Sequence, residues 1–179
     1  MVIIMSSELR QTSEIFARRY LNYGPDEAIV SWAEKMVLSG FSSDGLLILL
    51  GEIEPFNKFE IDSLLDRIQN ELLLPKIQSE NEALIVIATA YVQRFLTGGA
   101  SSASALSDLA QLYYAKKADV TYDFYLLHHA AADLEMGWFQ HYWPNADRNN
   151  IQQIIREKCI NWVEDHPLTE WQQYEWKPG

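Results

Sequence analysis

The sequence predicts an all-α protein, and three observations lead to this class. The stretch Glu80–Leu96 is apolar at nearly every position, follows a Ser79-x-x-Glu82 capping box, and is closed by Gly98. Elsewhere, apolar residues recur at the three- and four-residue spacing of amphipathic helices. No segment alternates apolar and polar residues between turn signals, as a half-buried strand does. We expect a single domain of about eight helices, arranged as antiparallel helical hairpins around a central buried helix, Glu80–Leu96.

The central helix is the element on which this layout depends. Thr89 is the one polar residue between positions 83 and 92. A helix that is apolar nearly all round must be covered nearly all round. It is also shorter than the ~20 residues that span a bilayer. We therefore expect neighbouring helices, rather than lipid, to bury it.

Four helices are expected before it, over residues 7–23, 25–39, 44–50 and 57–73. Pro25 follows the glycine that ends the first of these and favours the first position of the second. Ser43 or Asp44 caps the third, whose aliphatic run would also suit a buried strand if the chain offered a second strand to pair with it. Phe59 belongs to the apolar stripe of the fourth, which Pro75 ends.

Three more helices are expected after it, over residues 105–117, 122–142 and 150–164. Residues 98–104 are rich in Gly, Ser and Ala, which is typical of a flexible connector. This connector offers an alternative division of the chain into parts 1–98 and 105–179. Gly137 marks a break within the helix 122–142, and the His166-Pro167 pair ends the last helix.

Composition narrows the classes of partner. The chain has 179 residues, of which 48% are hydrophobic and 22% charged, enough for a substantial core. Twenty-five acidic residues against 14 basic ones give a net charge of −11. Such a surface repels phosphate backbones and anionic lipid, so we expect neither nucleic acid nor membrane as a partner. It attracts a basic protein, although an acidic surface also serves solubility alone.

Cysteine usage and the opening residues bear on the compartment. Cys159 is the one cysteine, which excludes an intrachain disulfide and any zinc site with two thiolates. The apolar opening Met1–Met5 has no basic residue before it and does not resemble a signal peptide. We expect a cytoplasmic protein in a reducing compartment.

One segment could carry metal chemistry. Residues 122–143 contain His128, His129, Asp133 and His141. His129 and Asp133 lie one turn apart on a helix, and imidazole with carboxylate suits Zn, Fe or Mn. The segment lacks the Glu-x-x-His and His-Glu-x-x-His spacings of bundle and peptidase sites. The alternative is that these histidines lie at the edge of the core and bind no metal.

Aromatic residues are the other candidate functional feature. The chain has six Trp and nine Tyr, which concentrate from Tyr113 onward and are the residues most frequent in binding hot spots. The predicted partner-binding residues are Trp138, Trp143, Trp171, Tyr174 and Trp176. The alternative is that these rings fill the core. The tail from Trp171 onward either packs back onto the domain or binds a partner.

A family resemblance adds to this picture. It rests on four stretches, Ala28–Ala33, Gly40–Ser43, Leu49–Gly51 and Phe59–Ile61. Over Asp26–Gly98 they resemble the opening of small, uncharacterised bacterial all-helical proteins, some of which look like immunity or partner-binding proteins. The chain departs from that pattern at Leu50, where alanine is usual. The resemblance implies a helical-hairpin fold and no activity.

Together these features predict a non-enzymatic, acidic protein-interaction module of the bacterial cytosol. An immunity-type inhibitor of a basic partner, needing no cofactor, is the form that fits the charge. The alternative is a metal-dependent helical enzyme that uses the histidines and Asp133 of the segment 122–142.

Overall fold

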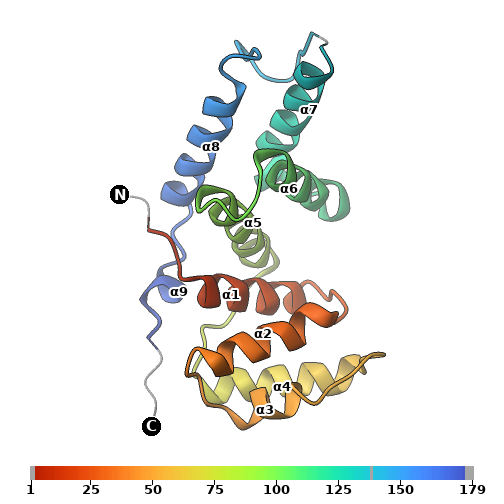
Figure 1. The fold of residues 1–179 in the computed structure, drawn as a ribbon, viewed down its shortest axis with the longest axis vertical. Helices are drawn as coiled ribbons and strands as arrows, with labels where there is room; N and C mark the ends of the chain where they lie inside the picture. The colour runs from red at the N-terminus through yellow and green to blue at the C-terminus, as the bar shows by residue number, and fades with distance from the viewer. Residues whose placement is uncertain (1–2, 138, 176–179) are drawn as a thin grey trace. The chain divides into compact units, whose positions relative to one another are not determined.

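The computed structural model describes residues 3–137 and 139–175, and within these ranges every regular element is a helix (Figure 1). This confirms the all-α class. The helices are α1 (Ser7–Tyr20), α2 (Glu27–Leu38), α3 (Asp44–Leu49), α4 (Lys58–Glu71), α5 (Glu80–Leu96), α6 (Ser102–Lys116), the 3₁₀ turn η1 (Asp119–Thr121), α7 (Tyr122–Met136), α8 (Ile151–Asp165) and α9 (Thr169–Gln173). None of these helices has the length and apolarity needed to cross a membrane.

The chain folds into two compact units. Of the described residues, the α1–α4 unit comprises 5–83 and 168–175, and the α6–α8 unit comprises 3–4, 84–137 and 139–167. The boundary between the units falls inside α5, between Ala83 and Leu84. The prediction of a flexible connector over 98–104 is wrong for the second half of that segment, because Ser101 caps α6 and the helix begins at Ser102. The division of the chain at this segment stays a prediction.

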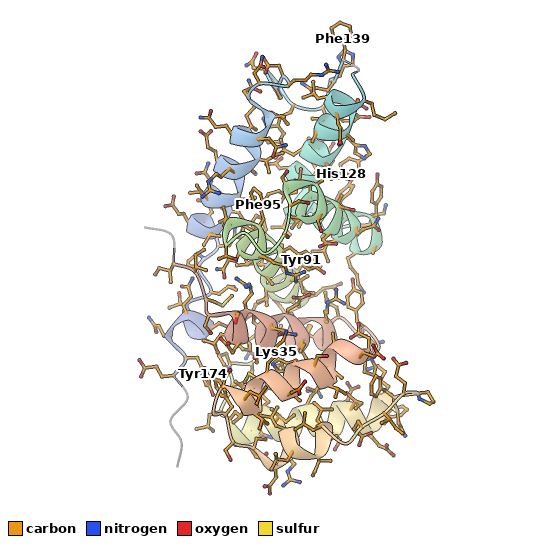
Figure 2. The ribbon with its side chains drawn as sticks, viewed as in Figure 1. Lys35, Tyr91, Phe95, His128, Phe139 and Tyr174 are labelled. Atoms are coloured by element: carbon orange, nitrogen blue, oxygen red, sulfur yellow. The ribbon has the colours of Figure 1, made fainter. Side chains whose placement is uncertain are left out.

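Helix α5 is buried as its composition predicts. Ala83, Val86, Ile87 and Ala88 are each at most 1% exposed, and Tyr91 and Phe95, labelled in Figure 2, follow on the next turns. Ser79 accepts a hydrogen bond from the amide of Glu82 at 3.1 Å. The predicted cap at the start of the helix is therefore present.

One hydrogen bond explains the single polar residue inside α5. Trp162 of α8 donates its indole N–H to the Thr89 hydroxyl at 2.9 Å, and both side chains are buried. Trp162 also meets Phe124 edge-on at 5.4 Å and stacks on His166, with 3.9 Å between ring centroids. A buried indole N–H without a partner would cost free energy. Thr89 avoids this cost by accepting the hydrogen bond in the core of the α6–α8 unit.

The core of the α1–α4 unit contains a similar Trp–Thr hydrogen bond. Trp32 is fully buried and donates its indole N–H to Thr12 at 2.9 Å. Phe16 packs edge-on against the Trp32 ring, at 6.1 Å between centroids. Thr12 donates its own hydroxyl hydrogen to the carbonyl of Glu8, so that both partners are satisfied. A polar side chain on α1 is thus part of the packed core.

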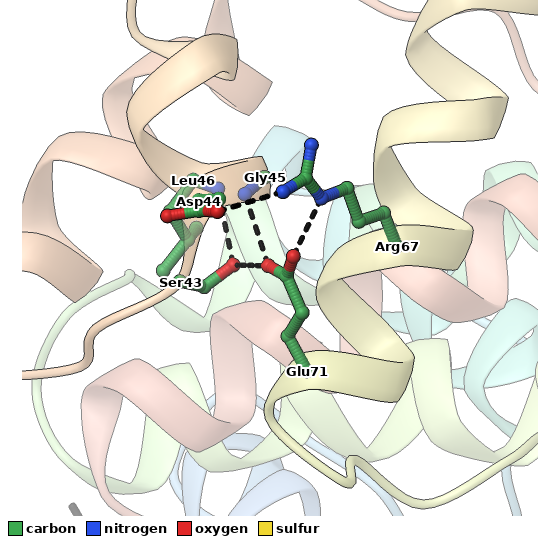
Figure 3. Close-up of polar contacts among 6 residues, drawn as sticks. All are labelled: Ser43, Asp44, Gly45, Leu46, Arg67 and Glu71. Atoms are coloured by element: carbon green, nitrogen blue, oxygen red, sulfur yellow. Dashed lines mark hydrogen bonds and ion pairs between the residues drawn. The ribbon is translucent and has the colours of Figure 1, made fainter.

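The start of α3 is held by α4 through the network in Figure 3. Ser43 caps α3 by accepting from the Leu46 amide at 3.2 Å and donates to the Glu71 carboxylate. The Gly45 amide also donates to Glu71, at 3.0 Å, and Arg67 pairs with the other oxygen of that carboxylate. Burial opposes ionisation of Glu71, but these bonds outweigh it and lower its pKa to about 2.

Several predicted boundaries and one predicted core residue are wrong. The first helix ends at Tyr20, not at residue 23, and the second begins after Asp26, whose side chain caps it, rather than at Pro25. Phe59 is 85% exposed, because the buried stripe of α4 begins at Ile61 instead. The helix expected over 122–142 is too long: α7 ends at Met136, the left-handed Gly137 caps it, and residues 139–142 are not helical. Helix α9 was not predicted.

Candidate functional site

A cluster of aromatic rings lies where α6 and α7 pack against each other. Tyr113 and Tyr114 stand in the last turn of α6, and η1 returns the chain into α7. Tyr122, Tyr125 and His129 follow at three- and four-residue spacing on α7, which places them on one face of that helix. The two helices therefore bring their aromatic residues to a common surface.

The rings form a connected set. Tyr125 lies at the centre, with centroid distances of 4.7 Å to Tyr113, 5.2 Å to Tyr114 and 5.8 Å to Tyr122. His129 extends the set, 4.7 Å from Tyr125. We call these rings and Tyr142 the tyrosine cluster. Its members are Tyr113, Tyr114, Tyr122, Tyr125, His129 and Tyr142.

Tyr142 reaches the cluster from the chain beyond α7. Its ring lies 5.2 Å from that of His129. Three members of the cluster remain open to solvent: Tyr114 is 45% exposed, Tyr122 43% and Tyr142 40%. Each of these three rings also packs against another ring of the cluster, so each is covered in part and exposed in part.

Tyr114 is the member of the cluster whose pKa departs clearly from its ordinary value. Hydrogen bonding with Tyr125, burial and the nearby phenols raise the pKa of Tyr114 above its ordinary value. Tyr114 is therefore a neutral phenol, and its hydroxyl shares a hydrogen bond with His129 Nε2 at 3.0 Å. Neighbouring rings thus surround His129, and the arrangement offers both aromatic contact area and hydrogen-bonding groups.

The residues of the metal hypothesis have different surroundings. His129 belongs to the tyrosine cluster, and its ring lies 5.3 Å from that of His128, which lines a pocket against α6 and α8. His141 is exposed in the segment after α7. Across residues 3–137 and 139–175, no three His, Cys, Asp or Glu side chains are grouped to hold a metal ion. The Zn, Fe or Mn alternative, with Asp133 as a ligand, stays a prediction.

The predicted partner-binding tryptophans lie in different places. Trp171 is 2% exposed, and the nearby Tyr174 donates its hydroxyl to the Leu72 carbonyl at 2.6 Å. Of the two fates expected for the tail, packing is the one found for these two residues. Trp143 is half-buried in the segment after α7. Trp138 and Trp176 fall outside the described residues.

Sequence reasoning did not single out the pair Tyr113 and Tyr114. The available signal was two adjacent tyrosines at the end of one helix, followed by Tyr122 and Tyr125 at the start of the next. No family model, curated protein or solved structure matches this chain. The site is therefore interpreted from its own geometry.

Proposed function

We propose that this chain is a non-enzymatic protein-interaction module whose tyrosine cluster binds a basic protein partner. The observation that carries the proposal is the connected set of rings, with Tyr114, Tyr122 and Tyr142 each at least 40% exposed. Tyrosine gives a large amphipathic contact area at a small cost in conformational entropy, and it is frequent in hot spots.

Charge supports a basic partner. The segment 102–136, which carries most of the cluster, has five carboxylates and two lysines, a formal charge of −3 within a chain of −11. Lys117 Nζ lies 6.0 Å from the Tyr113 ring centroid, so one ring of the cluster already takes part in a cation–π contact. Arginine or lysine side chains of a partner would make the same cation–π contact. An immunity-type inhibitor of the bacterial cytosol is the form of module we favour.

The test begins with affinity capture from the native host and continues with the captured protein in purified form. Association and dissociation rates are measured by surface plasmon resonance for the wild type, Tyr114→Ala and Tyr142→Ala. The matched control is Phe59→Ala, an exposed aromatic residue on α4. We expect each cluster variant to raise the dissociation rate at least about tenfold and the control to leave it unchanged.

Salt separates charge steering from packing. Between about 50 and 500 mM salt the screening length falls from roughly 14 to 4 Å, so the association rate should drop several-fold. The proposal requires a captured protein of high pI. An acidic partner, a salt-independent association rate, or equal dissociation rates for Tyr114→Ala and Phe59→Ala contradicts it.

A further inference from the structure

A pocket separate from the tyrosine cluster lies among the start of α6, one face of α7 and the start of α8. Its volume is about 580 Å³, within the range of sites that hold small molecules. Leu106, Ala132 and Ile151 are among its apolar lining residues. His128, Arg148 and Gln152 are among its polar ones. The pocket therefore combines apolar surface with a few hydrogen-bonding groups, as small-molecule sites do.

One side-chain cation and two helix N-termini at the pocket attract an anionic group. Arg148 is the one formal cation among the lining residues, and its Nε donates to the Leu134 carbonyl at 2.8 Å, which fixes the guanidinium at the pocket. Ser102 and Ile151 are the first residues of α6 and α8, so two helix N-termini add partial positive charge. The Ser102 hydroxyl donates to the Gln152 side chain at 2.8 Å and joins the two helix starts.

Two further groups limit the kind of anion. Glu135 is the one carboxylate among the lining residues, and it disfavours a doubly charged ligand such as phosphate. Burial, and then the neighbouring His129, lower the pKa of His128, which is therefore neutral near pH 7. A neutral imidazole supplies a hydrogen bond but no second positive charge.

We propose that this pocket binds a small monocarboxylate with an apolar tail. The carboxylate pairs with Arg148, and the tail lies against Leu106, Ala132 and Ile151. The arrangement uses one cation for one negative charge and covers the apolar part of the pocket. No member of the tyrosine cluster lines the pocket, although His128 contacts His129, so the binding site differs from the surface of the proposed function.

The experiment titrates the full chain with hexanoate and follows backbone amide shifts by ¹⁵N NMR. Hexanol and inorganic phosphate are the comparison probes, one without the charge and one without the tail. We expect hexanoate to shift amides at the starts of α6 and α8 and on α7. It should bind at least about tenfold more tightly than either comparison probe, since a charge-assisted hydrogen bond is lost with hexanol. Equal affinities, or no shifts up to about 20 mM hexanoate, would overturn the inference.

Variants locate the site. Arg148→Gln removes the cation and Ala132→Phe fills the pocket, so each should weaken hexanoate binding about tenfold or more. Arg156→Gln is the matched control, because Arg156 is an exposed cation on α8 that does not line the pocket. Tyr114→Ala should leave hexanoate binding intact. An unchanged affinity in Arg148→Gln, with Arg156→Gln as the comparison, contradicts the assignment. If either pocket variant fails to fold, the affinities of the wild-type chain for hexanoate, hexanol and phosphate still test the inference.

Discussion

The Glu71 carboxylate should make the stability of the α1–α4 unit depend on pH. In the folded chain it accepts from Ser43 and the Gly45 amide and pairs with Arg67, and its pKa falls from 4.5 to about 2. A carboxylate whose pKa is lower when folded stabilises the fold above its unfolded pKa. This stabilisation is lost as the pH falls through the folded pKa, so the window runs from about 4.5 down to about 2.

The size of the effect follows from the same shift. About 2.5 pKa units correspond to an upper bound of roughly 3.4 kcal/mol, at about 1.36 kcal/mol per unit. The Glu71 side chain is 28% exposed, and solvent screening reduces the value. We therefore expect Glu71→Gln, which keeps the shape and removes the charge, to cost about 1–2 kcal/mol at pH 7.

The assay compares unfolding by denaturant at pH 7, 4.5 and 3, followed by circular dichroism. Hydrogen exchange at the Gly45 and Leu46 amides gives a local readout at the start of α3. The cost of Glu71→Gln should shrink steadily below pH 4.5. Glu34→Gln, an exposed carboxylate on α2, is the control and should cost little at any pH. A cost that stays constant from pH 7 to 3, or no cost at pH 7, refutes the reasoning.

Three further predictions concern the buried cores. Trp32→Phe and Trp162→Phe each leave a buried threonine without its indole donor. Each should therefore lower the free energy of unfolding by about 1 kcal/mol more than Trp171→Phe, because the Trp171 indole N–H has no partner among the described residues. Denaturant unfolding of the three variants checks this order. Ile87→Ala, at a site 1% exposed, should cost about 2–5 kcal/mol, and an unchanged melting temperature would show that the packing of α5 is misassigned. Burial raises the pKa of Cys159 to about 12, so iodoacetamide at pH 8 should not label the folded chain within the time in which it labels the unfolded one, as mass spectrometry would report.

Local signals made some helix starts predictable. A capping residue and the amide that it satisfies are neighbours in sequence, so Ser79 could be identified from the residues alone, and Ser43 was one of two candidates for α3. The caps Asp26 and Ser101 were missed, although they carry the same kind of signal. The expected reciprocal bond differs in one detail, because Glu82 accepts from the Gln78 amide rather than from that of Ser79. Periodicity was less decisive on α4. The predicted apolar stripe included Phe59, but tertiary packing buries Ile61 and leaves Phe59 exposed.

The tyrosine cluster lay beyond sequence reasoning for a geometric reason. Whether the rings of α6 meet those of α7 depends on the turn between them, where Lys117 adopts a left-handed conformation with φ +52° and η1 follows. The same limit applied to the histidines. His128 and His129 are adjacent, so their side chains leave the helix about 100° apart. His129 joins the tyrosine cluster, and His128 lines the pocket.

The stacking of Trp162 on His166 gives the α6–α8 unit an optical signal of its own. The indole of Trp162 has an imidazole stacked on it, with 3.9 Å between ring centroids, only while this unit is folded. Unfolding separates the two rings and exposes the indole to water. His166→Gln should therefore change the emission of the folded chain and leave that of the unfolded chain unchanged. The difference between wild type and His166→Gln thus reports how much of the α6–α8 unit is folded.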